Sequence, residues 1–119
     1  MSQIDFELFA KKSGVSFKNK ALLEQAFTHR SYINENKETS REHNERLEFL
    51  GDAVLELVIT GFLYKKYPKA TEGDLTAYRS ALVNATTCAK VATDLGVNDF
   101  LLLSKGEAKD KGTKARQII

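Results

Sequence analysis

Four carboxylates recur at spacings that place them on one side of a helix, and we call them the acidic stripe. They are Glu45, Glu48, Asp52 and Glu56. Wound at about 100° per residue, they occupy an arc of about 80°. Like charges at this spacing destabilise an exposed helix by roughly 0.2–0.5 kcal/mol per pair, and partial burial adds to that penalty. Hard cations such as Mg²⁺ take oxygen ligands and would offset it, so the pair Glu48 and Asp52 predicts one shared cation site.

The rest of this predicted helix, over residues 44–67, is apolar on most of its circumference. The apolar side chains opposite the acidic stripe are Leu47, Leu50, Val54, Leu57, Val58 and Phe62, and those beside it are Phe49 and Ala53. This pattern predicts a central, substantially buried helix, with the stripe on the floor of a cleft. Glu72 follows the turn at Pro68 and could reach the same cleft. The alternative is a solvated acidic face packed against lysines elsewhere, and spacing alone favours neither.

Helical periodicity runs through nearly the whole chain, and no stretch shows convincing strand alternation. Helices are predicted over residues 5–12, 20–29, 44–67, from 71 onward, and 84–95. Residues 31–41 are polar and are predicted to form a loop. Asn19, and Thr71 with Asp74, have the types and spacing of N-terminal caps, while Gly14 suits the left-handed position after a helix. We therefore expect an all-α fold in a single domain over residues 1–119.

Composition excludes several classes of protein. The 119 residues are 42% hydrophobic, which is enough for one core and argues against wholesale disorder. The single cysteine, Cys88, excludes an internal disulfide framework and a cysteine-ligated zinc site, and it indicates a reducing cytosol. The most apolar stretch, residues 53–64, is too short to span a bilayer, so we expect a soluble protein with no membrane partner.

Positive charge is concentrated near the end of the chain. The formal net charge is only +2, but residues 105–119 contain five basic and two acidic groups, against 13 and 14 in the rest. We call Lys105, Lys109 and Lys111 the basic segment. A solvated loop is one interpretation of such a composition, and a loop that contacts phosphates is the other.

Residues 43–60, with the run HNERLEFLGD, closely resemble the signature of the ribonuclease III family. Three further matches follow the order and spacing of that family. They are residues 17–32 with a Thr-His-Arg-Ser segment, residues 67–84 with Glu-Gly-Asp-Leu-Thr, and residues 101–107. A chance match is improbable for the nine-residue motif NERLEFLGD when three further matches occur in the same order along the chain.

The resemblance implies a fold, an activity and a set of partners. The family fold is an all-helical endonuclease domain that acts as a homodimer. It cleaves double-stranded RNA by divalent-metal-dependent phosphodiester hydrolysis in cytoplasmic RNA processing, including that of ribosomal RNA, and leaves 5′-phosphate and 3′-hydroxyl ends. The implied cofactor is Mg²⁺, with Mn²⁺ as the alternative.

Family roles carry over to matching positions of this sequence. Glu48 and Asp52 match catalytic, metal-binding carboxylates, and Glu45 and Glu72 match acidic residues of the same metal cleft. Phe49 matches an aromatic side chain that inserts into the partner subunit. The basic segment lies in or near a matching loop, which implies contacts with the RNA backbone. Glu56 matches no functional position, so it remains a helix-surface carboxylate.

The sequence departs from the family pattern at its end. In the family, the matched stretch continues into a helix with an Asp and a Glu, the last of which is a principal metal ligand, and many bacterial members then carry a double-stranded-RNA-binding domain. Neither occurs before Ile119. We therefore expect a partial catalytic domain that lacks the last helices of the fold and is weakly active or inactive alone.

Two other functions stay open at this point. One is a non-catalytic ribonuclease-III-like module that binds RNA or scaffolds a ribonucleoprotein, although such modules usually lose the acids that this chain retains. The other is an all-helical metal-dependent nuclease or phosphohydrolase that acts on another substrate.

Overall fold

The computed structural model describes residues 4–109, and their regular structure is helical. The α-helices are α1 (Phe6–Ser13), α2 (Lys20–Ala26), α3 (Arg30–Glu35), α4 (Glu45–Lys66), α5 (Glu72–Leu82), α6 (Ala85–Asp94) and α7 (Lys105–Lys109), and a 3₁₀ helix, η1, covers Val97–Asp99. None of these helices is both long enough and apolar enough to cross a membrane. The predicted all-α class is confirmed.

The predicted caps form. Gly14 ends α1 with φ of 73°, as expected, and Asp5, which was predicted to lie inside that helix, instead caps it by accepting hydrogen bonds from its first turn. The side chain of Asn19 accepts a bond from the Leu22 amide at the start of α2. Thr71 and Asp74 make a reciprocal capping box on α5. These local bonds satisfy amides that a helix leaves without partners, which is why sequence patterns locate these ends well.

Two predicted boundaries are wrong, and long-range contacts explain both. Residues 31–41 are not all loop, because α3 occupies Arg30–Glu35. The His29 side chain caps α3, and the Ser31 hydroxyl accepts a hydrogen bond from the Ser104 amide at 3.0 Å. Helix α2 also ends three residues early, at Ala26, because the next residues pair with Leu102 instead of continuing the helix.

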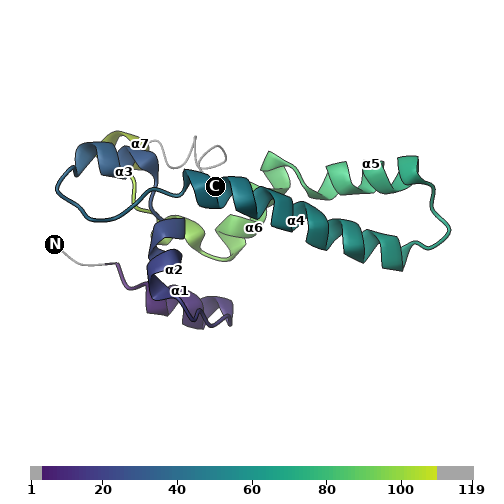
Figure 1. Cartoon of the computed structure of the whole chain (residues 1–119), viewed down its shortest axis with the longest axis horizontal. Helices are drawn as coiled ribbons and strands as arrows, with labels where there is room; N and C mark the ends of the chain where they lie inside the picture. Colours follow the sequence, from purple (N-terminus) through teal and green to yellow (C-terminus); the bar gives the residue numbers. More distant parts are fainter. Residues whose placement is uncertain (1–3, 110–119) are drawn as a thin grey trace.

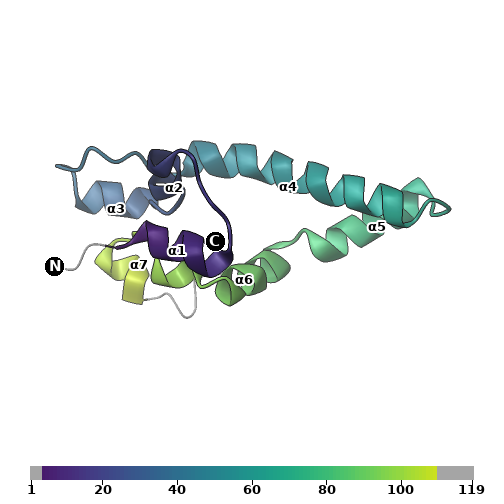
Figure 2. The same ribbon diagram turned by 90° about the horizontal axis from the view of Figure 1, so that it is seen from below.

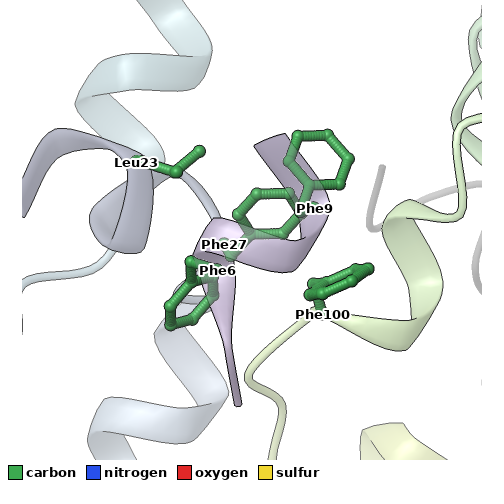
Figure 3. Close-up of a cluster of buried hydrophobic side chains, with 5 residues drawn as sticks. All are labelled: Phe6, Phe9, Leu23, Phe27 and Phe100. Carbon is green, nitrogen blue, oxygen red and sulfur yellow. The ribbon is translucent and has the colours of Figure 1, made fainter. Parts of the chain in front are cut away.

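An aromatic cluster forms the main core, where α1, the end of α2 and the segment after η1 meet (Figure 3). Its buried residues are Phe6, Phe9, Leu23, Phe27 and Phe100. The rings of Phe9 and Phe27 pack edge to face with centroids 4.8 Å apart, and Phe100 lies 5.4 Å from Phe9. Edge-to-face contact of this kind adds to the gain from burying the rings, so the cluster ties the two ends of the described chain together.

Helices α4 and α5 form an arm that leaves this core and folds back at Pro68 (Figure 1). In the view from below, α4 and α5 diverge from the tip of the arm, α6 follows α5, and the smaller helices gather at the open end (Figure 2). The Cα radius of gyration is 16.4 Å, whereas a compact domain of 100 residues has about 13 Å. The arm makes the molecule elongated.

The expectation of a buried central helix is wrong for this chain. Leu63 is the one buried residue of α4. Phe49 is 83% exposed and Leu57 is 73% exposed, although they lie on apolar sides of the helix. Within the described residues α4 packs mainly along α5, and one neighbour cannot cover a helix that is apolar on most of its circumference.

A junction around Thr28 fixes where α4 begins. Thr28 is fully buried, and its carbonyl oxygen accepts a hydrogen bond from the Asn44 amide at 2.9 Å. The Asn44 side chain does not cap α4 but donates to the carbonyl oxygen of Ala26, also at 2.9 Å. On the other side, the amide of His29 donates to the carbonyl oxygen of Leu102 at 3.0 Å. The segments around Thr28, Asn44 and Leu102 thus meet at this junction, and Asn44 is the residue directly before the first carboxylate of the acidic stripe.

Candidate functional site

Three carboxylates of the acidic stripe line one open hollow of about 550 Å³. Its lining comes from the first half of α4, with one residue from α6, and consists of Glu45, Glu48, Phe49, Gly51, Asp52, Leu55 and Cys88. We call it the acidic hollow. Because α4 advances one turn for every 3.6 residues, Glu45, Glu48 and Asp52 stand on successive turns and face the same space.

The other two acidic candidates do not join this hollow. Glu56, one turn further along α4, is not part of its lining. Glu72 begins α5 and lines a separate hollow of about 170 Å³ beside Thr76 and Arg79. Helix α4 lines both hollows, the acidic hollow with its first half and the other with Thr60, Leu63 and Tyr64 near its end, and it extends for roughly 33 Å over 22 residues. Within one chain, therefore, Glu72 stands at the opposite end of the arm from Glu48, and its predicted metal role stays a prediction.

The acidic hollow carries little compensating charge. Glu45 pairs with Arg30, whose Nη1 lies 3.3 Å from Oε1 of the carboxylate. The other ion pairs of the described residues, Lys20 with Glu7 and Arg41 with Glu24, involve no stripe residue. Within the part of the chain that is described, Glu48 and Asp52 therefore face the hollow without a cationic partner. Both residues are exposed, so a ligand can reach them from solvent.

The donor set fits a partly hydrated hard cation better than a closed protein cage. Residues 4–109 contain no group of three or more His, Cys, Asp or Glu side chains arranged to hold a metal ion. Mg²⁺ often binds through one or two carboxylates and completes its shell with water and substrate phosphates. Glu48 and Asp52, one turn apart on the same face, provide the two carboxylates that such a site requires.

The basic segment is only partly described. Lys105 and Lys109 lie in the short helix α7 and are exposed, whereas Lys111 lies outside the described residues. Helix α7 is held against α3, because the Lys105 amide donates to the Glu35 carboxylate at 3.0 Å. The part of this segment that was expected to be a loop is thus helical, and α3 supports it.

Two residues near the acidic hollow were missed by sequence reasoning. Arg30 is 15 residues from Glu45 in sequence, and no spacing rule connects an arginine on one helix with a carboxylate on another. Its one signal is membership of the Thr-His-Arg-Ser segment. Cys88 of α6 lines the acidic hollow and is half-buried, whereas sequence reasoning assigned it no role at this site.

Comparison with known proteins identifies the family. The family model described as ribonuclease-III-like matches residues 19–119. The chain belongs to the ribonuclease-III-like family. Ribonuclease 3 of Bacillus licheniformis is 50% identical over 114 residues, which cover 96% of this chain and 46% of that protein. Ribonuclease 3 of Bacillus velezensis has the same identity and coverage. The chain thus spans about half the length of the curated relatives that it matches.

Solved structures of the family share the fold. A nuclease domain of ribonuclease III from Campylobacter jejuni, described for structural flexibility in a region involved in dimer formation, superposes with a TM-score of 0.83 at 41% identity. The match covers 96% of this chain and 76% of that one. A second structure of that nuclease domain gives a TM-score of 0.80 at 42% identity, over 94% and 72% of the two chains. The expected ribonuclease III nuclease fold is confirmed.

Proposed function

We propose that this chain is the catalytic part of a ribonuclease III, an endoribonuclease that hydrolyses double-stranded RNA with a divalent metal ion. The observation that carries the proposal is the meeting of Glu45, Glu48 and Asp52 in one hollow of a chain that belongs to the family. A module that only binds RNA would have no use for uncompensated carboxylates, because they repel phosphates. The proposed setting is cytoplasmic RNA processing, including that of ribosomal RNA.

Glu48 and Asp52 are the proposed ligands of Mg²⁺ or Mn²⁺. A divalent cation bound there would lower the pKa of a bound water and stabilise charge on phosphoryl oxygens. The two carboxylates hold and orient the cation from adjacent turns of α4. The junction at Thr28 and Asn44 fixes the start of that helix, so both carboxylates are presented in a constant direction. The expected products carry 5′-phosphate and 3′-hydroxyl ends.

The proposed substrate is an RNA duplex, which proteins recognise mainly through its shape, its phosphates and its 2′-hydroxyl groups. The basic segment supports this proposal because its lysines offer phosphate contacts without reading bases. Lys105 and Lys109 are exposed on α7, on the side of the molecule where α3 approaches the acidic stripe through Arg30.

The proposed partner is a second copy of the chain, with Phe49 in the interface. Phe49 borders the acidic hollow and is 83% exposed, which is unfavourable for a phenylalanine in water. Insertion into a second copy would bury it beside the carboxylates. A relative whose nuclease domain has a region involved in dimer formation supports this assembly.

A cleavage assay on a perfect RNA duplex tests the catalytic proposal. Both the 119-residue chain and the product of the gene extended downstream of Ile119 should be assayed with Mg²⁺ and with excess EDTA. We expect cleavage by the extended product that EDTA abolishes, and loss of at least a hundredfold in rate for Asp52→Asn and Glu48→Gln. Glu56→Gln is the matched control, because it removes a carboxylate of the same helix that lies outside the acidic hollow.

The outcomes separate the functions. Equal loss of activity in Glu56→Gln and Asp52→Asn would mean that general helix charge, and not the hollow, determines the rate. Binding of the duplex without cleavage by the extended product would instead support the non-catalytic RNA-binding or scaffold module. Cleavage of another phosphodiester in preference to duplex RNA would support the phosphohydrolase alternative.

A further inference from the structure

Arg30 brings a positive charge to the edge of the acidic hollow. Its Nη1 donates to both carboxylate oxygens of Glu45, at 3.3 and 3.5 Å. The side chain is 61% exposed, so most of the guanidinium faces solvent. A guanidinium has five N–H donors in a planar fork, and the contacts with Glu45 use only Nη1. Donors therefore remain for an acceptor that approaches from solvent.

The backbone at Arg30 is held by the same junction that fixes the acidic stripe. Arg30 is the first residue of α3, and it follows His29, whose amide is bonded to Leu102. Glu45 is the first residue of α4, and it follows Asn44, whose amide is bonded to buried Thr28. The backbone directly before Arg30 and directly before Glu45 is thus held by hydrogen bonds of the same junction. An arginine positioned in this way loses less freedom when it binds a ligand.

The same helix connects Arg30 with the basic segment. One residue after Arg30, the Ser31 hydroxyl accepts the Ser104 amide, and at the end of α3 the Glu35 carboxylate accepts the Lys105 amide. Helix α3 therefore has Arg30 at its first residue beside the acidic hollow, and α7, which carries Lys105 and Lys109, is bonded to it through Ser31 and Glu35. At the acidic hollow, Arg30 is the cation that stands next to carboxylates that would otherwise repel an anionic chain.

We propose that Arg30 binds a phosphate of the RNA backbone at the edge of the acidic hollow, an inference that rests on the proposed function. Arginine suits this role because its planar fork matches two phosphate oxygens at once, which a lysine ammonium cannot do. Glu45 acts on Arg30 as a positioning residue, since its carboxylate holds the guanidinium at the hollow. The simpler role is a surface ion pair, but a pair this exposed adds little to folding stability.

Binding of a perfect RNA duplex across a salt series tests the proposal. The measurements use the extended product in an Asp52→Asn background, which keeps the duplex intact, and report fluorescence anisotropy. For Arg30→Ala we expect about tenfold weaker binding at 0.15 M salt and a slope of log affinity against log salt reduced by about 0.7–0.9. Arg30→Lys should restore most of the slope but only part of the affinity, because the charge returns without the fork.

Arg41→Ala is the matched control, because Arg41 forms the other Arg–Glu pair of the described residues. Its Nη1 lies 2.9 Å from Glu24, its side chain is only 27% exposed, and its guanidinium lies over the Phe6 ring. We expect Arg41→Ala to lower the melting temperature and leave the salt slope unchanged.

Unchanged affinity and slope in Arg30→Ala, or an equal change in slope in Arg41→Ala, would overturn the proposal. The catalytic proposal fails separately. If the Asp52-containing protein does not cleave the duplex but Arg30→Ala still lowers the slope, the phosphate contact stands and the nuclease does not.

Discussion

Replacement of Phe49 by alanine should weaken the proposed dimer strongly and leave the folded chain intact. Fully burying a phenylalanine side chain contributes roughly 1.5–3 kcal/mol. Because Phe49 is 83% exposed, about 1.2–2.5 kcal/mol of that gain is still available in one copy. A two-fold dimer presents the same patch twice, so truncation should remove about 2.5–5 kcal/mol. The dissociation constant should then rise between about 60-fold and about 4000-fold.

Sedimentation equilibrium over a wide concentration range measures this change directly. Val58→Ala is the matched control, because Val58 is 61% exposed on the same helix and lies about 180° around it from Phe49. It should leave the dissociation constant nearly unchanged. Thermal unfolding under monomeric conditions should not distinguish Phe49→Ala from the parent, since the side chain makes few contacts in one copy. A parent that stays monomeric, or a dimer indifferent to Phe49→Ala, would refute the reasoning.

Three further predictions concern the core, the backbone and the basic segment. Phe27→Ala should destabilise the fold by about 3–5 kcal/mol in urea unfolding, because it empties the centre of the aromatic cluster; a loss below about 1 kcal/mol would show that the cluster is not the main core. Gly14→Ala should destabilise the fold by about 1–2 kcal/mol, because φ is 73° there. Gly61→Ala should stabilise it by about 0.5–1 kcal/mol, because Gly61 lies within α4 and an added Cβ would meet open space. Changes of the same sign in both variants would contradict the assigned conformations. Replacing the three lysines of the basic segment with glutamine should lower the salt slope of duplex binding by about 2–3, and an unchanged slope would leave those lysines a role in solubility alone.

Local chemistry made much of the secondary structure predictable. Asp74 three residues after Thr71 makes a cap whose partners are neighbours in sequence, so the pattern contains the whole interaction. Helix α3 was not predictable in this way. Its support comes from Ser104 and Lys105, which are 73 and 70 residues away from Ser31 and Glu35. Polar composition indicates a loop unless such distant partners are known.

The candidate site was predictable as far as one helix determines it. Helical spacing alone places Glu45, Glu48 and Asp52 together, and the structure shows them in one hollow. Glu72 follows the end of the 22-residue α4, so its distance from Glu48 depends on how α5 folds back along α4. Helical spacing within one element does not determine that packing. The burial of α4 was predicted wrongly because apolar periodicity shows which faces favour contact, but it does not show whether a neighbour covers them.

A rigid-body rotation of the arm of α4 and α5 about the Thr28 junction would move the two ends of α4 by different amounts. A rotation of about 5° at the junction displaces the far end of the roughly 33 Å helix by about 3 Å, but moves Glu48, one turn from the junction, by less than about 1 Å. Small rigid-body rotations would therefore leave Glu48 and Asp52 nearly in place, while Glu72 and the turn at Pro68 would move by about 3 Å. A second molecule that binds the tip of the arm would therefore change the positions of Glu72 and Pro68 and leave Glu48 and Asp52 nearly in place.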